Sequence, residues 1–205
     1  GYARASGKVG VAIATSGPGA ANMITGLATA MMDSSPIVCI TGQVPRPAIG
    51  SDAFQEMDIS GAVIPVTKHS YLVMEIKDLA KTIKEAFAIA RSGRPGPVLI
   101  DIPKDLQAEE FEFIYPEEKV TIPGQNPIKN DISSVDLDCA VKMIANAKKP
   151  VILAGHGVLI SGASDEVISL SEKSSIPISW TLLGSGAVPA SHPLNMGMMG
   201  MHGEF

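Results

Sequence analysis

Residues 9–19 read VGVAIATSGPG, and this stretch decides the fold. Its apolar run over 9–14, which ends in a Gly/Pro-rich turn, predicts a buried strand and a tight turn. Apolar residues at helical spacing over 20–32 predict a helix, and a second apolar run over 36–41 predicts another strand. A strand, a helix and a strand with short joints form a βαβ unit, so we expect a parallel sheet with a right-handed crossover.

The rest of the chain continues this α/β pattern. Residues 2–6 resemble the last turn of a helix that Gly7 closes. Helices are predicted over 77–91, 136–147 and 164–173, and strands over 97–102, 151–154 and 176–180. Residues 107–133 are rich in Glu, Pro, Asn and Asp without a sustained period, which indicates an exposed interdomain linker. The predicted fold class is therefore α/β, with two incomplete parallel-sheet domains over 1–106 and 134–205.

Composition narrows the function classes. The 205 residues are 45% hydrophobic and 18% charged, which is typical of a globular protein. A net charge of −5 without a basic stripe argues against nucleic-acid binding, and no apolar stretch could span a membrane. Two cysteines without a metal-binding pattern favour a reduced cytoplasmic setting. Because the chain has no initiator Met and no closing element, we expect an internal fragment.

Two glycine-bearing turns each leave two interpretations open. Residues 16–22 join a strand to a helix, so their backbone N–H groups could bind an anion, or the glycines could only allow close packing. The second predicted strand ends in Thr41-Gly42-Gln43 without the acidic residue of a dinucleotide site, which argues against NAD. Gly155-His156-Gly157 is a similar turn in the second domain. His156 has no second ligand at metal spacing, so no metal site is predicted.

Three further features could bind a ligand. Residues 197–203 combine three glycines with three methionines, which suits a flat ring system or a loosely packed core. Arg94 lies at the start of the strand over 97–102, and Lys104 follows its carboxyl end. Residues beyond the carboxyl ends of parallel strands face the ligand crevice, so Lys104 is placed to bind a substrate carboxylate unless it is a plain surface charge. These residue patterns alone predict a two-domain α/β ligand-binding protein.

Read together, the motifs resemble one enzyme family. The stretches GYARASGKVGVAIATSGPGA, MMDSSPIVCITGQVP, IGSDAFQEMDI, SGRPGPVLIDIPKD, KKPVILAGHG and TLLGSGAVPASHPLNMGMMGMHG occur in order over nearly the whole chain. They are similar to the catalytic large subunit of acetohydroxyacid (acetolactate) synthase, a thiamine-diphosphate-dependent family. The resemblance implies condensation of pyruvate with pyruvate or 2-oxobutyrate, with loss of CO2, in branched-chain amino-acid biosynthesis.

The same resemblance implies the domains and cofactors. Residues 1–106 would be the later part of the thiamine-diphosphate pyrimidine-binding domain, and 134–205 the start of a central Rossmann-like FAD-binding domain. The family's catalytic glutamate would lie upstream of Gly1, and the Mg²⁺ site would lie in a C-terminal domain outside this chain. No catalytic residue is therefore expected here, and the fragment alone would be inactive. FAD would be structural.

Site residues follow from the resemblance position by position. Gln55 would approach thiamine diphosphate. Pro45, Phe54, Lys68 and Lys104 would line the substrate channel. The expected FAD contacts are Asp33, Ser34, Arg94, Gly155, His156, Gly157, Thr181, Leu182, Met199, Gly200, Met201 and His202.

The resemblance also implies partners. A second catalytic subunit, in a homodimer or tetramer, and a small regulatory subunit are expected, in the cytoplasm or in the plastid of a plant or alga. Two alternatives remain: another thiamine-diphosphate carboligase or oxidase with the same domains, and a non-catalytic nucleotide-binding module.

Overall fold

The computed structural model describes residues 1–122 and 132–203, and it divides the chain into two compact units, Gly1–Ile128 and Lys129–Phe205. The first unit contains a four-stranded sheet in the order β1-β2-β4-β3. Its strands are β1 (Gly10–Ala14), β2 (Ile37–Gln43), β3 (His69–Leu72) and β4 (Pro97–Pro103), and every pairing is parallel. The predicted class, α/β with parallel sheets, is confirmed.

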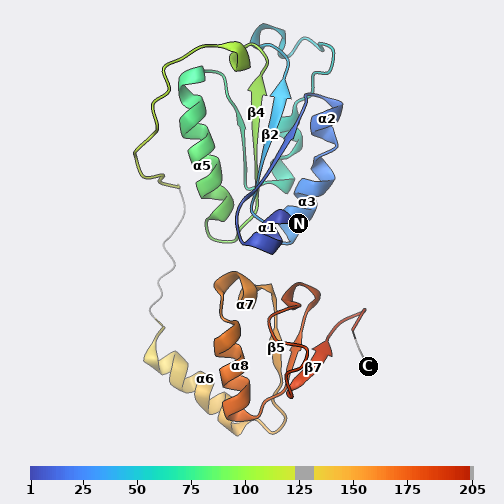
Figure 1. Ribbon diagram of the computed structural model, residues 1–205, viewed down its shortest axis with the longest axis vertical. Helices are drawn as coiled ribbons and strands as arrows, with labels where there is room; N and C mark the ends of the chain where they lie inside the picture. Colours follow the sequence, from blue (N-terminus) through green and yellow to red (C-terminus); the bar gives the residue numbers. More distant parts are fainter. Residues whose placement is uncertain (123–131, 204–205) are drawn as a thin grey trace. The chain divides into compact units, whose positions relative to one another are not determined.

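Helices cover both faces of this sheet (Figure 1). On one face α5 (Leu79–Arg91) places Ala86 and Ala90 against Val98 and Ile100 of β4. On the other face α3 (Ile24–Met32) contributes Leu27 to a cluster with Cys39 and Leu99. Successive strand residues point to opposite faces, and every residue of β4 is buried. This explains why residues 97–102 are apolar on both faces, except for the buried Asp101, rather than alternating between apolar and polar.

Several local features differ from the predicted elements. The helix predicted over 20–32 is two helices, α2 (Pro18–Ala21) and α3, separated at residues 22–23. Strand β3 was not predicted because the sequence His69-Ser70-Tyr71-Leu72 is half polar, which an edge strand tolerates. The predicted helix end at Gly7 is confirmed: α1 (Tyr2–Ser6) stops at this residue, whose φ of 67° is left-handed, as is common just after a helix.

Shorter elements complete the first unit. They are α4 (Ile59–Ala62), η1 (Arg46–Ala48), η2 (Ile64–Val66), η3 (Ile76–Asp78) and η4 (Leu106–Ala108). Residues 109–122 form no helix or strand and contact α5, where the Lys84 Nζ donates to the Glu118 carbonyl at 2.8 Å. The same ammonium lies 5.2 Å from the centre of the Tyr115 ring. Residues 123–131 of the predicted linker lie outside the described residues.

The second unit has a three-stranded parallel sheet in the order β5-β6-β7. Its elements are α6 (Ser134–Asn146), β5 (Ile152–Ala154), α7 (His156–Ser161), α8 (Ser164–Ser174), β6 (Ile178–Trp180), η5 (Leu182–Gly184) and β7 (Asn195–Met198). Ala154, Ile178, Ala187 and Val188 form its buried core. The Gly/Met-rich segment thus supplies part of an unpredicted strand, because β7 ends with its first two residues. Among the described residues, no helix combines the length and apolar character that crossing a membrane requires.

Candidate functional site

The carboxyl edge of the first sheet carries a cavity of about 460 Å³. Its polar lining comes from the turn after β1, the end of β2 and the segment after β4, namely Thr15, Ser16, Thr41, Gln43, Lys104 and Gln107. In open parallel sheets, ligands bind beyond this edge. The position of Lys104 in this lining agrees with the placement that the sequence predicts.

The turn after β1 packs against the loop of residues 50–58, which we call the Gln55 loop. Gly17 has a left-handed φ, and a Cβ atom added there would lie 2.6 Å from the Gln55 carbonyl oxygen. The absence of a side chain at Gly17 thus lets the backbone of the Gln55 loop approach the turn closely. The helix that follows, α2, has only four residues, so it offers little of the macrodipole that an anion would need.

The Gln55 loop has an unusual backbone. Asp52 and Gln55 adopt left-handed φ values of 56° and 62°. Such a backbone costs a non-glycine residue on the order of 1 kcal/mol. Glu56 closes the loop, because its carboxylate accepts hydrogen bonds from the Gly50 and Ala53 N–H groups. These backbone donors lower the pKa of Glu56. Phe54, at the tip, is 88% exposed.

A buried polar network lies beneath the same edge. The Thr41 hydroxyl donates to Asp101 at 2.7 Å, and the Gln43 amide donates to Asp101 at 2.9 Å and to the Met57 carbonyl at 2.8 Å. Asp101 is 1% exposed. Burial raises the pKa of Asp101 to about 6, although the hydrogen bonds from Thr41 and Gln43 favour its ionised form. The network ties the ends of β2 and β4 to the base of the Gln55 loop.

Pro45 directly follows this network and is exposed at the start of η1. The next residue, Arg46, joins three segments: its Nε donates to Asp105 at 2.7 Å, its Nη1 to the Met74 carbonyl at 2.9 Å, and its Nη2 to Glu109. Hydrogen bonds to the two carboxylates raise the pKa of Arg46. The hydrogen bond from the Arg46 N–H, followed by that from its guanidinium, lowers the pKa of Asp105. Arg46 therefore holds the segment that contains Pro45 in a fixed position relative to the segment that contains Lys104.

The opposite, amino edge of the sheet brings together three of the residues expected to contact FAD. The Arg94 Nε donates to the Ser34 hydroxyl at 2.7 Å, and its Nη2 donates to the Met32 carbonyl at 2.7 Å. Asp33 forms an ion pair with Arg4. Arg94 thus covers the last carbonyl groups of α3, where a cation is favoured by the helix dipole.

Lys68 also lies at the amino edge, since its N–H bonds to the Pro97 carbonyl at 2.8 Å at the start of β4. Its ammonium donates to the Ile89 and Ser92 carbonyls at the end of α5, and burial lowers the pKa of Lys68. The seven residues of β4 span roughly 20 Å, so one copy of the chain does not bring Lys68 together with Lys104.

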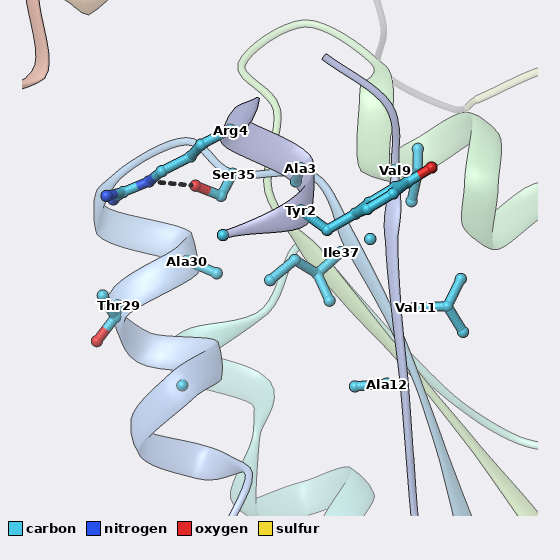
Figure 2. Close-up of a pocket in the computed structure, with 13 residues that line it drawn as sticks. Tyr2, Ala3, Arg4, Val9, Val11, Ala12, Thr29, Ala30, Ser35 and Ile37 are labelled. Atoms are coloured by element: carbon cyan, nitrogen blue, oxygen red, sulfur yellow. Dashed lines mark hydrogen bonds between the residues drawn. The ribbon is translucent and has the colours of Figure 1, made fainter. Parts of the chain in front are cut away.

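Beside this edge, a hollow of about 880 Å³ lies between α1, the outer strand β1 and α3. Figure 2 shows Arg4 directed toward Ser35, to which its Nε donates at 3.3 Å, with Thr29 and Ala30 of α3 nearby. The lining is mostly apolar. Val11 of β1 is 53% exposed, so this side of the edge strand is uncovered in the first unit.

In the second unit, every residue expected to contact FAD follows the carboxyl end of a strand. Gly155, His156 and Gly157 follow β5, Thr181 and Leu182 follow β6, and Met199, Gly200, Met201 and His202 follow β7. Hydrogen bonds join these segments, from the Thr181 N–H to the Ala154 carbonyl at 3.0 Å and from the Met199 N–H to the Trp180 carbonyl at 2.8 Å. The structure therefore gathers the nine residues along one sheet edge. His156 and Gly157 lie inside α7, with Gly155 as its N-cap.

This second edge is open. A Cβ atom added at Gly155 or Gly157 would meet nothing within 4 Å, and Met201 is 92% exposed. Across residues 1–122 and 132–203, no group of three His, Cys, Asp or Glu side chains could hold a metal ion.

Two domain models match the chain. Residues 1–62 match the N-terminal TPP binding domain of thiamine pyrophosphate enzymes, and residues 137–204 match the central domain of the same enzymes. The chain belongs to the thiamine pyrophosphate enzymes. The match to the N-terminal domain includes the turn after β1 and the Gln55 loop, and the match to the central domain includes the open edge of the second sheet.

Among thiamine pyrophosphate enzymes, the chain is similar along its whole length to acetolactate synthase large subunits. It is 51% identical to a probable large subunit from Methanocaldococcus jannaschii over 99% of this chain and 34% of that protein. Identity is 49% with the large subunit from Corynebacterium glutamicum, over 99% of the chain and 32% of the relative. Identity is 47% with the large subunit from Porphyra purpurea, over 98% of the chain and 34% of the relative. The chain spans about one third of the length of these relatives.

Four residues of the carboxyl edge were not singled out from the sequence: Gln43, Arg46, Glu56 and Asp101. Each acts through a partner that is distant in sequence or through backbone N–H groups, neither of which a residue pattern reveals. One signal was available for Asp101, since a carboxylate within the apolar run Val98-Leu99-Ile100-Asp101-Ile102 must be buried and therefore hydrogen-bonded.

Proposed function

We propose that this chain is part of an acetolactate synthase large subunit, which condenses pyruvate with a second 2-oxo acid, pyruvate or 2-oxobutyrate, and releases CO2. The supporting observation is that 47–51% of the aligned residues are identical to those of acetolactate synthase large subunits, over 98–99% of the chain. The domain models alone support only a thiamine pyrophosphate enzyme, which another carboligase or oxidase of this class would also satisfy.

The carboxyl edge of the first sheet suits the proposed role. Bound thiamine diphosphate would supply an electron sink for loss of CO2 from a 2-oxo acid. Gln55 would contact this cofactor, and Phe54 would form an apolar wall beside it. Pro45 and Lys104 would line the path of the substrate, where the Lys104 ammonium attracts its carboxylate. Lys68 lies at the other edge, so its proposed place in the substrate channel requires a second copy of the chain.

FAD is proposed to contact the amino edge of the first sheet through Asp33, Ser34 and Arg94. In the second unit it is proposed to contact the nine residues that follow β5, β6 and β7. Two features support this fit: the backbone at Gly155 and Gly157 is open, and the exposed methionines after β7 offer apolar surface to a flat ring. Mg²⁺ is proposed to bind outside this chain, in a part of the subunit that the chain does not cover.

The proposed partners are a second large subunit, in a homodimer or tetramer, and a small regulatory subunit. The name "large subunit" given to the relatives supports the existence of a smaller one.

Product analysis tests the proposal. The intact subunit that carries this chain, supplied with thiamine diphosphate, Mg²⁺, FAD and pyruvate, is expected to release acetolactate and CO2. Addition of 2-oxobutyrate is expected to give acetohydroxybutyrate as well. Consumption of pyruvate without either product would replace this proposal with another thiamine-dependent reaction.

A further inference from the structure

The Gln55 loop is held in its conformation by contacts on three sides. Its left-handed residues, Asp52 and Gln55, would relax to other backbone conformations unless the surrounding structure prevented it. A loop that presents an 88% exposed Phe54 also gains little from burial of its tip. The contacts that hold it must therefore come from its own polar groups and from its base.

The first contact is internal. The two carboxylate oxygens of Glu56 accept hydrogen bonds from different backbone groups, Oε1 from the Gly50 N–H and Oε2 from the Ala53 N–H at 2.9 Å. The Glu56 N–H in turn donates to the Ala53 carbonyl at 2.9 Å. One anion thus closes the segment on either side of Asp52. The lowered pKa of Glu56 agrees with a carboxylate that stays ionised at neutral pH.

The other two contacts anchor the loop to the sheet. At its base, the Gln43 amide bridges the Met57 carbonyl and the buried Asp101 carboxylate. At its side, the Gln55 backbone lies so close to Gly17 that no side chain fits between them. Both anchors lie on the carboxyl side of the Glu56-closed turn, at Gln55 and Met57, and they fix that side relative to the sheet.

We propose that Glu56 is a positioning residue of the active site: its carboxylate closes the Gln55 loop and so holds Phe54 and Gln55 toward the cofactor and substrate. This inference rests on the function proposed above. Glu56 itself touches neither ligand in this proposal, because both of its oxygens are directed at backbone N–H groups of its own loop.

The test compares Glu56→Gln with the wild type in the intact subunit. Glutamine keeps the size of the side chain but presents an amide donor to one of the two backbone N–H groups. Glu110→Gln is the matched control, since it makes the same change at an exposed residue whose side chain forms no hydrogen bond with the described part of the chain. Four quantities are measured: deuterium uptake of residues 44–60, kcat with saturating pyruvate, the Kd for thiamine diphosphate, and the unfolding temperature.

For Glu56→Gln we expect faster deuterium uptake confined to residues 44–60, a kcat at least tenfold lower, a higher Kd for thiamine diphosphate, and an unfolding temperature within a few degrees of wild type. Glu110→Gln should match the wild type in all four quantities. Faster uptake without a change in kcat or Kd would overturn the positioning role, and unchanged uptake would overturn the closure itself. If the glutamine variant does not fold, Glu56→Asp, which retains the charge on a shorter side chain, is compared by the same criteria.

Failure of the proposed function is recognised separately. A wild-type subunit that forms no acetolactate contradicts the reaction, whereas the uptake and the Kd for thiamine diphosphate still decide whether Glu56 positions the loop.

Discussion

Gly17 and Asp101 shape the carboxyl edge of the first sheet through close backbone packing and buried hydrogen bonds. Gly17 is required because the Gln55 carbonyl occupies the space of a side chain. Asp101 is required to accept hydrogen bonds from Thr41 and Gln43 in a region without solvent. Each makes a separate prediction.

Gly17→Ala is expected to destabilise the intact subunit more than Gly7→Ala. Both glycines have left-handed φ values, 56° and 67°. Gly7 lies in the αL region with ψ 6°, where alanine costs about 1 kcal/mol, whereas Gly17 has ψ −116° and lies outside that region, so the backbone strain of alanine is larger at Gly17. Only at Gly17 does the new methyl group meet a backbone atom, and this overpacking should add about 1–3 kcal/mol. Thermal unfolding of both variants measures the difference. Equal losses would contradict both the larger backbone strain and the close contact at Gly17.

The ionisation of Asp101 is expected to weaken the fold as the pH rises from about 4 to 6. Its pKa in the folded state is about 6, above the ordinary value of 3.8, so the folded protein holds the proton more tightly than the unfolded one in this window. Stability from this residue is therefore greatest below pH 4 and is lost through pH 6. Unfolding temperatures of the wild type and Asp101→Asn across pH 4–7 measure this, and their difference should change only in that window. Parallel curves would contradict the shifted pKa.

At the scale of elements, the long periodic segments followed from the sequence and the short polar ones did not. The sequence predicted the buried strands β2 and β4 and the amphipathic helix α5, because the spacing of apolar residues indicates which side chains are buried. Strand β3 was missed, since its four residues form an edge whose pairing with β4 depends on segments far along the chain. The candidate site divides in the same way. The position of Lys104 follows from strand direction, whereas the closure of the Gln55 loop by Glu56 needs coordinates.

The hydrogen bonds of Arg94 are expected to stabilise the end of helix α3. Arg94→Lys removes the planar fork that serves Ser34 and the Met32 carbonyl together, while it keeps the positive charge. We expect the free energy of unfolding of the end of α3 to fall by about 1 kcal/mol, a small value because the Arg94 side chain is exposed. Deuterium exchange over residues 24–35 should be faster. FAD content after purification should also fall. Arg91→Lys is the control, because its side chain donates to the Phe87 carbonyl of its own helix. Equal exchange in both variants would show that Arg94 does not stabilise α3.

At the scale of the whole molecule, each unit has a core of its own. Leu99 is buried in the first unit and Ile178 in the second, both fully. Leu99→Ala and Ile178→Ala should each cost about 2–5 kcal/mol. Faster deuterium exchange is expected over residues 1–122 for the first variant and over 132–203 for the second. Exchange that rises throughout the chain in either variant would show that the two units unfold as one.

The network of Thr41, Gln43 and Asp101 also restricts how this sheet can evolve. A mutation at any one of these three residues leaves a hydrogen-bond donor or acceptor unpaired in a place that water does not reach. A single change therefore lowers the stability of the fold even when the new residue has the right volume. Apolar replacement of all three removes these side-chain donors and acceptors together, and only the Met57 carbonyl and the Val44 N–H then need new partners. Homologous chains should therefore change these positions together: a lineage that loses the acid at 101 should also lose the hydroxyl at 41 and the amide at 43, and should hold the loop at Met57 by another contact.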